Sequence, residues 1–173
     1  PPLHGQRMRS YAQRMATAAH DCASKWHEGE DFRAYNFTQS VSLEVILDTV
    51  FGATEPVVRS GLKALLPELL DLGNGLPMFL KFLRLPVVPS WRRFIAVRKQ
   101  TDELIGQLIR DRTSSDDRGD DILSMLLEAE YDDGSRMDAS EVRDQLLSIL
   151  SAGHETTAIA MAWTLYWLHR HPE

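Results

Sequence analysis

The chain has 173 residues, of which 43% are hydrophobic and 25% are charged, and this is the composition of an ordinary globular domain. Its 19 basic and 25 acidic residues give a formal net charge of −6, which argues against a nucleic-acid partner. The single cysteine, Cys22, allows no disulfide within the chain and fits a reducing compartment, so we expect a cytoplasmic protein. The longest apolar run, 156–168, is shorter than the ~20 residues that a membrane-spanning helix needs.

Apolar residues recur at three- and four-residue steps along most of the chain, whereas alternating strand patterns are nearly absent, so the expected fold class is all-α. Turn and capping residues divide the pattern into predicted helices at 8 to about 29, 38–51, 54–73, 90–112, 122–130 and 139–170. Thr38 is the expected cap of the second helix, and Gly52 is expected to end it in the left-handed region. The buried stripe of the first helix is expected to hold Met8, Tyr11, Met15, Ala19, Cys22 and Trp26.

One stretch departs from the acidic balance of the chain. Residues 75–101 include six basic side chains and no acidic one. Within it, residues 76–89 mix proline, leucine and phenylalanine with basic residues, which predicts an apolar loop or a short helix at the surface. Phe79 and Phe82 would suit contact with a substrate or a membrane surface, and a lid packed on its own core fits the same pattern.

The last predicted helix, 139–170, is the longest. Asp138 and Glu141 form a capping box at its start, with aspartate in the place of serine or threonine. At a rise of 1.5 Å per residue the helix would be roughly 48 Å long. A helix of this length is expected to cross an entire domain.

Inside this helix, the segment Ser-Ala-Gly-His-Glu-Thr-Thr at 151–157 places small and polar residues between apolar turns. Glycine in a helix interior costs ~1 kcal/mol relative to alanine, so another factor must favour this segment. One helical face would offer a shallow groove with little side-chain volume, formed by Ile149, Ala152, Gly153, Thr156 and Ala160. Spacing alone leaves open whether the small residues make room for a ligand or let a second helix approach, with threonine hydroxyls bonded back to helix carbonyls.

A zinc site of the metalloprotease type is excluded for this segment. His154-Glu155 begins the pattern His-Glu-x-x-His, but Ala158 stands where the second histidine would be.

The segment Ala152-Gly153-His154-Glu155-Thr156-Thr157 resembles the oxygen-binding motif of cytochrome P450 monooxygenases, which lies in the long central helix of that family. Three further segments are similar to bacterial members at matching distances: Pro1 to Met8, Asp121 to Leu127 and Trp163 to Glu173. The resemblance implies that residues 1–173 form a single partial domain, the central helices of the cytochrome P450 fold, truncated at both ends.

Several parts of the family pattern do not occur in this sequence: the Glu-x-x-Arg pair, the haem loop with its axial cysteine, and the basic residues that hold the haem propionates. Cys22 does not replace the axial ligand, because Ala23-Ser24-Lys25 follows it and no Phe-x-x-Gly turn precedes it. We expect Cys22 to be a buried cysteine of a helix. The chain is therefore expected to hold no metal ligand and to be inactive when isolated.

In the family, a thiolate-ligated b-type haem activates O2, and the protein delivers protons to the bound oxygen. The resemblance implies that Thr156 and Glu155 are the catalytic residues: Thr156 offers its hydroxyl to the bound oxygen, and Glu155 relays protons from solvent. Because adjacent helical residues point about 100° apart, Glu155 is expected to face water or a basic partner, and a buried salt bridge is the alternative. The residues implied to border the haem and O2 are Ile149, Ala152, Gly153, Thr156 and Thr157.

The implied parent enzyme hydroxylates or epoxidises a small apolar organic substrate, with electrons from a ferredoxin or a reductase. Residues 76–93 would form the loop between the two helices that cover its substrate pocket. The alternative is a non-catalytic helical interaction module in which Gly153 only serves packing. A branch that rearranges its substrate or uses peroxide is a further alternative, and Thr156 speaks against it because such branches often lose that hydroxyl.

Overall fold

The computed structural model describes residues 6–29, 31, 33–52, 54–115 and 119–171. Within these residues the regular structure is helical, with one isolated antiparallel bridge between Glu130 and Arg136. The elements are α1 (Gln6–Ala23), α2 (Ala34–Phe51), α3 (Pro56–Gly73), α4 (Leu76–Phe79), the 3-10 turn η1 (Lys81–Leu83), α5 (Pro89–Ser114), α6 (Ile122–Glu128) and α7 (Ala139–Arg170). The predicted all-α class is confirmed.

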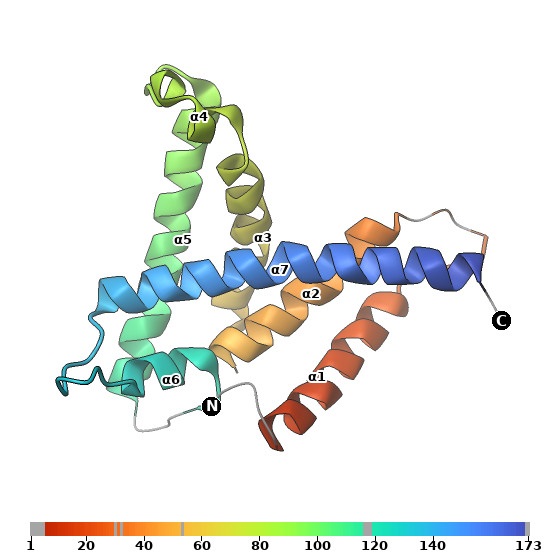
Figure 1. Ribbon diagram of the computed structural model, residues 1–173, viewed down its shortest axis with the longest axis horizontal. Helices are drawn as coiled ribbons and strands as arrows, with labels where there is room; N and C mark the ends of the chain where they lie inside the picture. The colour runs from red at the N-terminus through yellow and green to blue at the C-terminus, as the bar shows by residue number, and fades with distance from the viewer. Residues whose placement is uncertain (1–5, 30, 32, 53, 116–118, 172–173) are drawn as a thin grey trace.

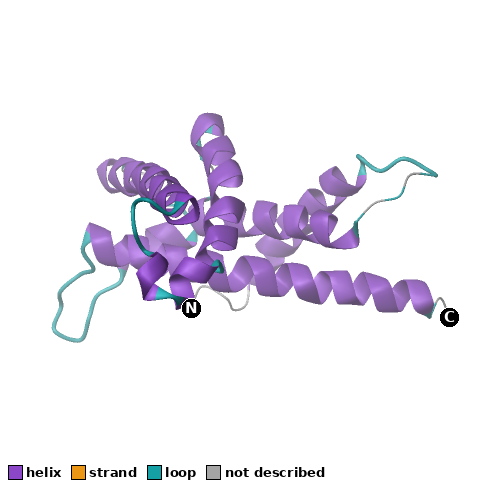
Figure 2. Ribbon diagram, turned by 90° about the horizontal axis from the view of Figure 1, so that it is seen from above, coloured by secondary structure: helices purple, strands orange, loops and turns teal. Residues whose placement is uncertain are grey.

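Helix α7 crosses the whole molecule, and α2 packs along it (Figure 1). Helices α3 and α5 form a pair that extends beyond α7 on one side and ends at α4, while α1 packs on α2 (Figure 1). Seen from above, α7 forms one edge of the molecule toward the C-terminal end (Figure 2). Across the described residues, every helix is too short or too polar to span a lipid bilayer.

The main core lies where α2, α3, α5, α6 and α7 meet. Every one of these helices contributes side chains that water scarcely reaches, and burial of such apolar area is the dominant stabilising term. Its buried members are Leu47, Val50, Phe51, Val58, Leu62, Leu66, Ile105, Ile109, Leu123, Val142, Leu146 and Leu150. A second, smaller cluster of Leu69, Phe94 and Val97 joins α3 to α5 further from this centre.

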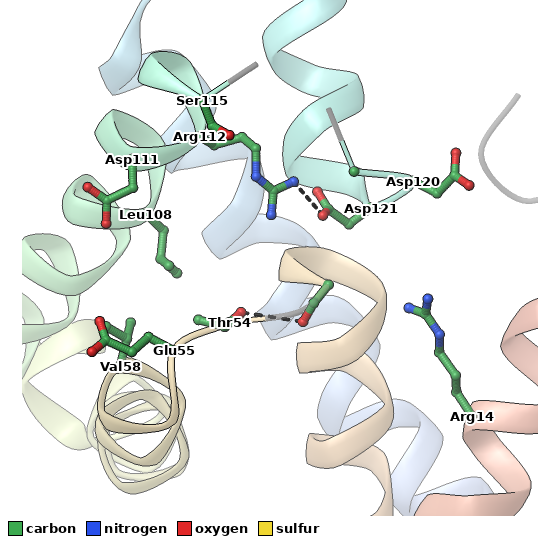
Figure 3. A pocket seen from close by; sticks show the side chains of 12 residues that line it. Arg14, Thr54, Glu55, Val58, Leu108, Asp111, Arg112, Ser115, Asp120 and Asp121 are labelled. Carbon is green, nitrogen blue, oxygen red and sulfur yellow. Dashed lines mark hydrogen bonds and ion pairs between the residues drawn. The ribbon is translucent and has the colours of Figure 1, made fainter. Parts of the chain in front are cut away.

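A buried ion pair ties three helices together at one end of the core. Arg112 of α5 donates to Asp121 Oδ2 at 2.5 Å and to the carbonyl oxygen of Phe51 at 3.1 Å. Asp121 also caps α6, because its Oδ1 accepts from the backbone N–H of Ser124 at 2.9 Å. A Cβ at Gly52, where φ is 63°, would lie 2.5 Å from Asp121 Oδ2, so both conformation and space require glycine there. Figure 3 shows Arg112 and Asp121 at the wall of a cleft of about 420 Å³.

Two predictions for the first helix are corrected. Helix α1 ends at Ala23 rather than near Gly29, and Met15 and Trp26 of the predicted stripe are 40% and 43% exposed. Helix α1 lies at the margin of the molecule, where α2 is its main partner, so a narrower stripe that includes Tyr11 and Cys22 is buried. The predicted burial of Cys22 is confirmed, and burial raises the pKa of its thiol.

Two helix boundaries also differ from prediction. Thr38 does not cap α2, which begins at Ala34; instead its buried hydroxyl donates to the carbonyl oxygen of Tyr35 at 3.0 Å. Helix α6 ends at Glu128, because the chain then turns through 132–134 and pairs with itself at the Glu130–Arg136 bridge. The predicted bounds of α7 and the left-handed end of α2 at Gly52 are confirmed.

The predicted surface segment is confirmed as short helical turns at the far end of the α3 and α5 pair, around α4 in Figure 1. Phe79 and Val87 are 75% and 79% exposed there. Arg84 donates from Nε to the carbonyl oxygen of Pro77 at 3.0 Å and lies over the ring of Trp91. These contacts join the segment to the start of α5, where Trp91 packs against the second cluster.

Candidate functional site

The register of α7 is set at its first turn. Asp138 Oδ1 accepts from the backbone N–H groups of Ser140 at 2.7 Å and Glu141 at 2.9 Å, while Glu141 Oε2 accepts from the N–H of Asp138 at 2.8 Å. This is the predicted capping box. The hydrogen bonds, first among them the one from the Ser140 hydroxyl, lower the pKa of Asp138 and keep it charged beside the positive end of the helix.

Helix α2 contacts α7 in the middle of the 151–157 segment. A Cβ placed on Gly153 would lie 2.6 Å from Ile46 Cδ1, so any side chain there would force the tip of Ile46 to move. One turn earlier on α2, the buried Ser42 donates from its Oγ to the carbonyl oxygen of His154 at 2.8 Å. Glycine at 153 therefore serves the close approach of a second helix, as the packing explanation of the small residues expects.

The helical face next to Gly153 is bare. Ala152, Thr156, Thr157 and Ala160 are all exposed, and the Thr156 hydroxyl donates to the carbonyl oxygen of Ala152 at 2.5 Å. This back-bond leaves the lone pairs of the Thr156 hydroxyl available to accept a hydrogen bond. The exposed strip thus presents two threonine hydroxyls among methyl groups.

The structure divides the predicted groove into two parts. Ile149 and Gly153 are half-buried, the first against the main core and the second against Ile46, whereas Ala152 and Thr156 belong to the bare strip. Helix α2 thus borders the predicted face at Gly153, while Ala152, Thr156 and Ala160 of that face are exposed. No sequence pattern pointed to Ile46 or Ser42, because their contacts with α7 join residues more than a hundred positions apart.

A mostly apolar cleft of about 480 Å³ begins next to the bare strip. It lies between α3, α5 and α7, and Ala152 and Ser151 form the end of it that is nearest to Thr156 along the helix. Its apolar wall is formed by Leu66, Leu69, Leu70, Phe94, Leu147 and Leu150. A small apolar molecule would fit its size and character.

His154 and Glu155 have contrasting surroundings. His154 is 3% exposed, its Nδ1 has no hydrogen-bond partner among the described residues, and burial lowers its pKa against the opposing charges of Glu155 and Asp71. Glu155 is half-buried, and its negative charge raises the pKa of Tyr35 on α2 after the larger effect of burial. Within the described part of the chain Glu155 has no ion pair, so the buried salt bridge is not observed there.

The described residues include no cluster of histidine, cysteine, aspartate and glutamate that could hold a metal ion. Cys22 lies on α1, whose main packing partner is α2, and it lines a cleft with residues of α2 and α3. The groups at the bare strip are therefore two threonine hydroxyls and several methyl groups, and the Glu155 carboxylate adjoins them.

Comparison with known proteins identifies the family. A family model for cytochrome P450 matches residues 1–173, the whole chain. The chain belongs to the cytochrome P450 family. It is 32% identical over 176 residues to cytochrome P450 138 of Mycobacterium tuberculosis and 34% identical over 174 residues to cytochrome P450 135B1 of the same species. These matches cover 100% and 99% of this chain but only 40% and 37% of the relatives.

Solved P450 structures share the fold. The haem domain of cytochrome P450DA superposes with a TM-score of 0.78 at 26% identity, over 99% of this chain and 38% of that one. A retinoic-acid-bound cyanobacterial CYP120A1 superposes with a TM-score of 0.75 at 21% identity, over 94% of this chain and 36% of that one, which supports the fold alone. This P450 chain thus spans about two fifths of the length of the relatives that it matches.

Proposed function

We propose that this chain is part of a haem-thiolate monooxygenase that uses O2 to hydroxylate or epoxidise a small apolar organic substrate. Family membership supports the reaction class, and the bare strip of Ala152 and Thr156 beside an apolar cleft is the single observation that carries the proposal. Electrons would come from a ferredoxin or a reductase, as in other members of the family.

The residues of the strip fit a haem. Ala152, Thr156 and Thr157 are exposed, and their small side chains would let a flat group approach the backbone of α7 closely. Ala152 and Thr156 would border the haem and the O2 site, and Ile149 and Gly153 would shape the helix behind them. When bound, the haem would supply O2 activation, with an axial thiolate from outside residues 1–173.

The chain's own residues would manage protons and water. The Thr156 hydroxyl can turn from the Ala152 carbonyl to donate outward, and it can accept a proton at the same oxygen. Glu155, half-buried and free of an ion pair in the described structure, would exchange protons with solvent at its carboxylate and pass them toward Thr156. The apolar wall of the neighbouring cleft would exclude bulk water from the substrate.

The packing of Gly153 against Ile46 favours a structural role for that glycine and is what a non-catalytic helical module would also show. It does not account for the exposed strip of hydroxyl and methyl groups beside that glycine on α7. The monooxygenase therefore explains more of the segment than the interaction module does.

The decisive experiment is expression of the protein from its full reading frame with haem supplied, followed by a spectrum of the ferrous carbon monoxide complex. We expect a red protein with the band characteristic of thiolate ligation. A colourless product, or a band typical of histidine ligation, contradicts the proposal.

Thr156→Ala tests the proton role within that protein. We expect a larger share of the consumed electrons to appear as hydrogen peroxide, with recovery in Thr156→Ser, which keeps the hydroxyl. Thr164→Ala is the matched control, because Thr164 is also exposed and donates to the carbonyl four residues earlier, at 2.9 Å. If all three variants release the same amount of peroxide as the parent, Thr156 has no such role.

A further inference from the structure

Ser42 makes a contact that local helix geometry does not explain. A serine within a helix commonly donates to a carbonyl of its own preceding turn, as Ser40 on α2 does to Asn36 at 2.9 Å. Ser42 instead donates across the helix interface to the carbonyl oxygen of His154 at 2.8 Å, and its side chain is buried. The bond joins positions 112 residues apart, so it reports the tertiary placement of α7 on α2.

The receiving carbonyl lies in the interior of α7, where helix geometry already pairs it with the amide of residue 158. Two residues earlier, the carbonyl of Ala152 also receives a side-chain donor, the Thr156 hydroxyl. Extra donors on helix carbonyls weaken the regular ladder and permit local bending. This turn of α7 is therefore held from outside as well as by its own backbone.

The contacts of α2 act on α7 in complementary ways. Because Gly153 has no side chain, Ile46 of α2 can lie close to the backbone of α7, so the two helices approach closely at this turn. The Ser42 hydrogen bond has direction, so it selects one rotation of α7 about its axis. A rotation by one residue corresponds to about 100° and would exchange the bare strip for a buried face.

We propose that Ser42 is a positioning residue for the oxygen-binding segment. It holds α7 at the rotation that turns Gly153 toward Ile46 and presents Ala152 and Thr156 on the bare side. The functional part of this inference rests on the proposed monooxygenase, whereas the structural part does not. Ser42 does not line the cleft, and its hydrogen bond reaches α7 at the backbone carbonyl of His154.

Hydrogen exchange tests the structural part without any need for catalysis. In the protein expressed from its full reading frame, Ser42→Ala is expected to speed amide exchange at 152–158 about two- to tenfold. This factor corresponds to the usual net contribution of one hydrogen bond to stability. Exchange at 142–150, which lies in the main core, is expected to stay as in the parent. Ser40→Ala is the matched control, because it removes a serine hydroxyl of the same helix that bonds only locally.

Ser42→Cys separates the hydrogen bond from the space that the side chain fills, since a thiol has a similar size but is a weak donor. We expect it to behave like Ser42→Ala. Exchange that matches the parent in Ser42→Cys, or that changes no more in Ser42→Ala than in Ser40→Ala, overturns the inference.

Carbon monoxide provides a second readout that a loss of stability alone would not move. In the haem-loaded protein, the infrared C–O stretching band senses polar groups beside the bound gas, so a rotated strip in Ser42→Ala is expected to shift or split it. Ser40→Ala is expected to leave the band unchanged. A faster exchange with an unmoved C–O band refutes the positioning role, while a protein that takes up no haem refutes the proposed function and leaves the exchange result to decide the structural part.

Discussion

The two halves of α7 follow the same helical geometry but have opposite surroundings. In the first half, Val142, Leu146 and Leu150 are fully buried among side chains of α2, α3, α5 and α6. In the second half, Trp163 and Leu168 are 58% and 63% exposed, although this half is the more aromatic of the two. An apolar side chain is buried only where another element supplies a facing surface, so hydrophobicity alone does not identify the core.

The aromatic residues of the second half pack on one another instead. Trp163 meets Tyr166 edge to face with ring centroids 5.6 Å apart, and Trp167 stacks on His171 at 5.5 Å. Such contacts between neighbouring turns of one helix cover only part of each ring. The exposed side of this half is continuous with a shallow hollow that Tyr35 of α2 also lines.

The largest expected effect contrasts one residue from each half. Leu146→Ala removes a fully buried side chain and is expected to lower the free energy of unfolding by about 2–5 kcal/mol. Trp163→Ala is expected to cost less than about 1 kcal/mol, because the indole is largely in water already. Urea denaturation of the two variants measures the difference, and equal losses would break the comparison.

The next largest effect is expected when leucine replaces a small residue of α7, and two such positions are compared. Gly153→Leu forces a side chain against Ile46 and is expected to cost about 1–3 kcal/mol. Ala160→Leu, at an exposed position, is expected to change stability by no more than about 0.5 kcal/mol. Thermal unfolding compares the two, and a harmless leucine at 153 would show that α2 does not approach as closely as described.

A smaller effect is expected at the start of the buried half. Asp138→Ala removes the acceptor of the capping box and is expected to cost about 1 kcal/mol, whereas Asp138→Asn keeps a good cap and is expected to lose only a part of that. Circular dichroism during urea denaturation gives both values. A cap that can be removed without loss would mean that packing of the first half alone sets where α7 begins.

The stability of the fold is expected to depend on pH through His154, which lies at the boundary between the two halves of α7. Because burial lowers the folded-state pKa of His154 below its ordinary value of 6.5, the unfolded chain binds the proton more tightly. The contribution of neutral His154 to stability is therefore complete above that value and is lost as the pH falls through 6.5 toward the lowered pKa. Glu155 and Asp71 oppose the shift but do not reverse it.

His154→Gln is expected to flatten the dependence of the unfolding midpoint on pH below 6.5. His20→Gln, at an exposed position of α1, is the control and is expected to leave the slope as in the parent. A slope that persists in His154→Gln would assign the pH response to the carboxylates instead.

Much of the fold was predictable from local signals. The bounds of α7 followed from the Asp138 capping box and from the lack of proline between 139 and 171. The end of α2 followed from Gly52. Such signals involve residues within about one helical turn of each other, so they can be recognised in the sequence. The start of α2 was missed because Arg33 precedes it without a side-chain cap, and Thr38 offered a false one.

The candidate site was predictable only in part. The segment 151–157 identified the family motif, but its five-residue face is divided because Ile46 packs on Gly153. Exposure of Met15 and Trp26 was missed for a related reason, since helical spacing shows which residues share a face and not whether a partner covers it.

The sequence by itself determined that the chain is helical, where its longest helix begins and ends, and that this helix carries the P450 motif, because capping, turn and spacing preferences are local. Only the tertiary structure decided which side of α7 is covered. Its buried positions, Val142, Leu146, Leu150, His154 and Ala158, advance by four residues. Because a helix has 3.6 residues per turn, positions four apart form a line that winds slowly around it. The contacts with neighbouring helices, and not the periodicity of the sequence, decide that the buried side chains follow this line.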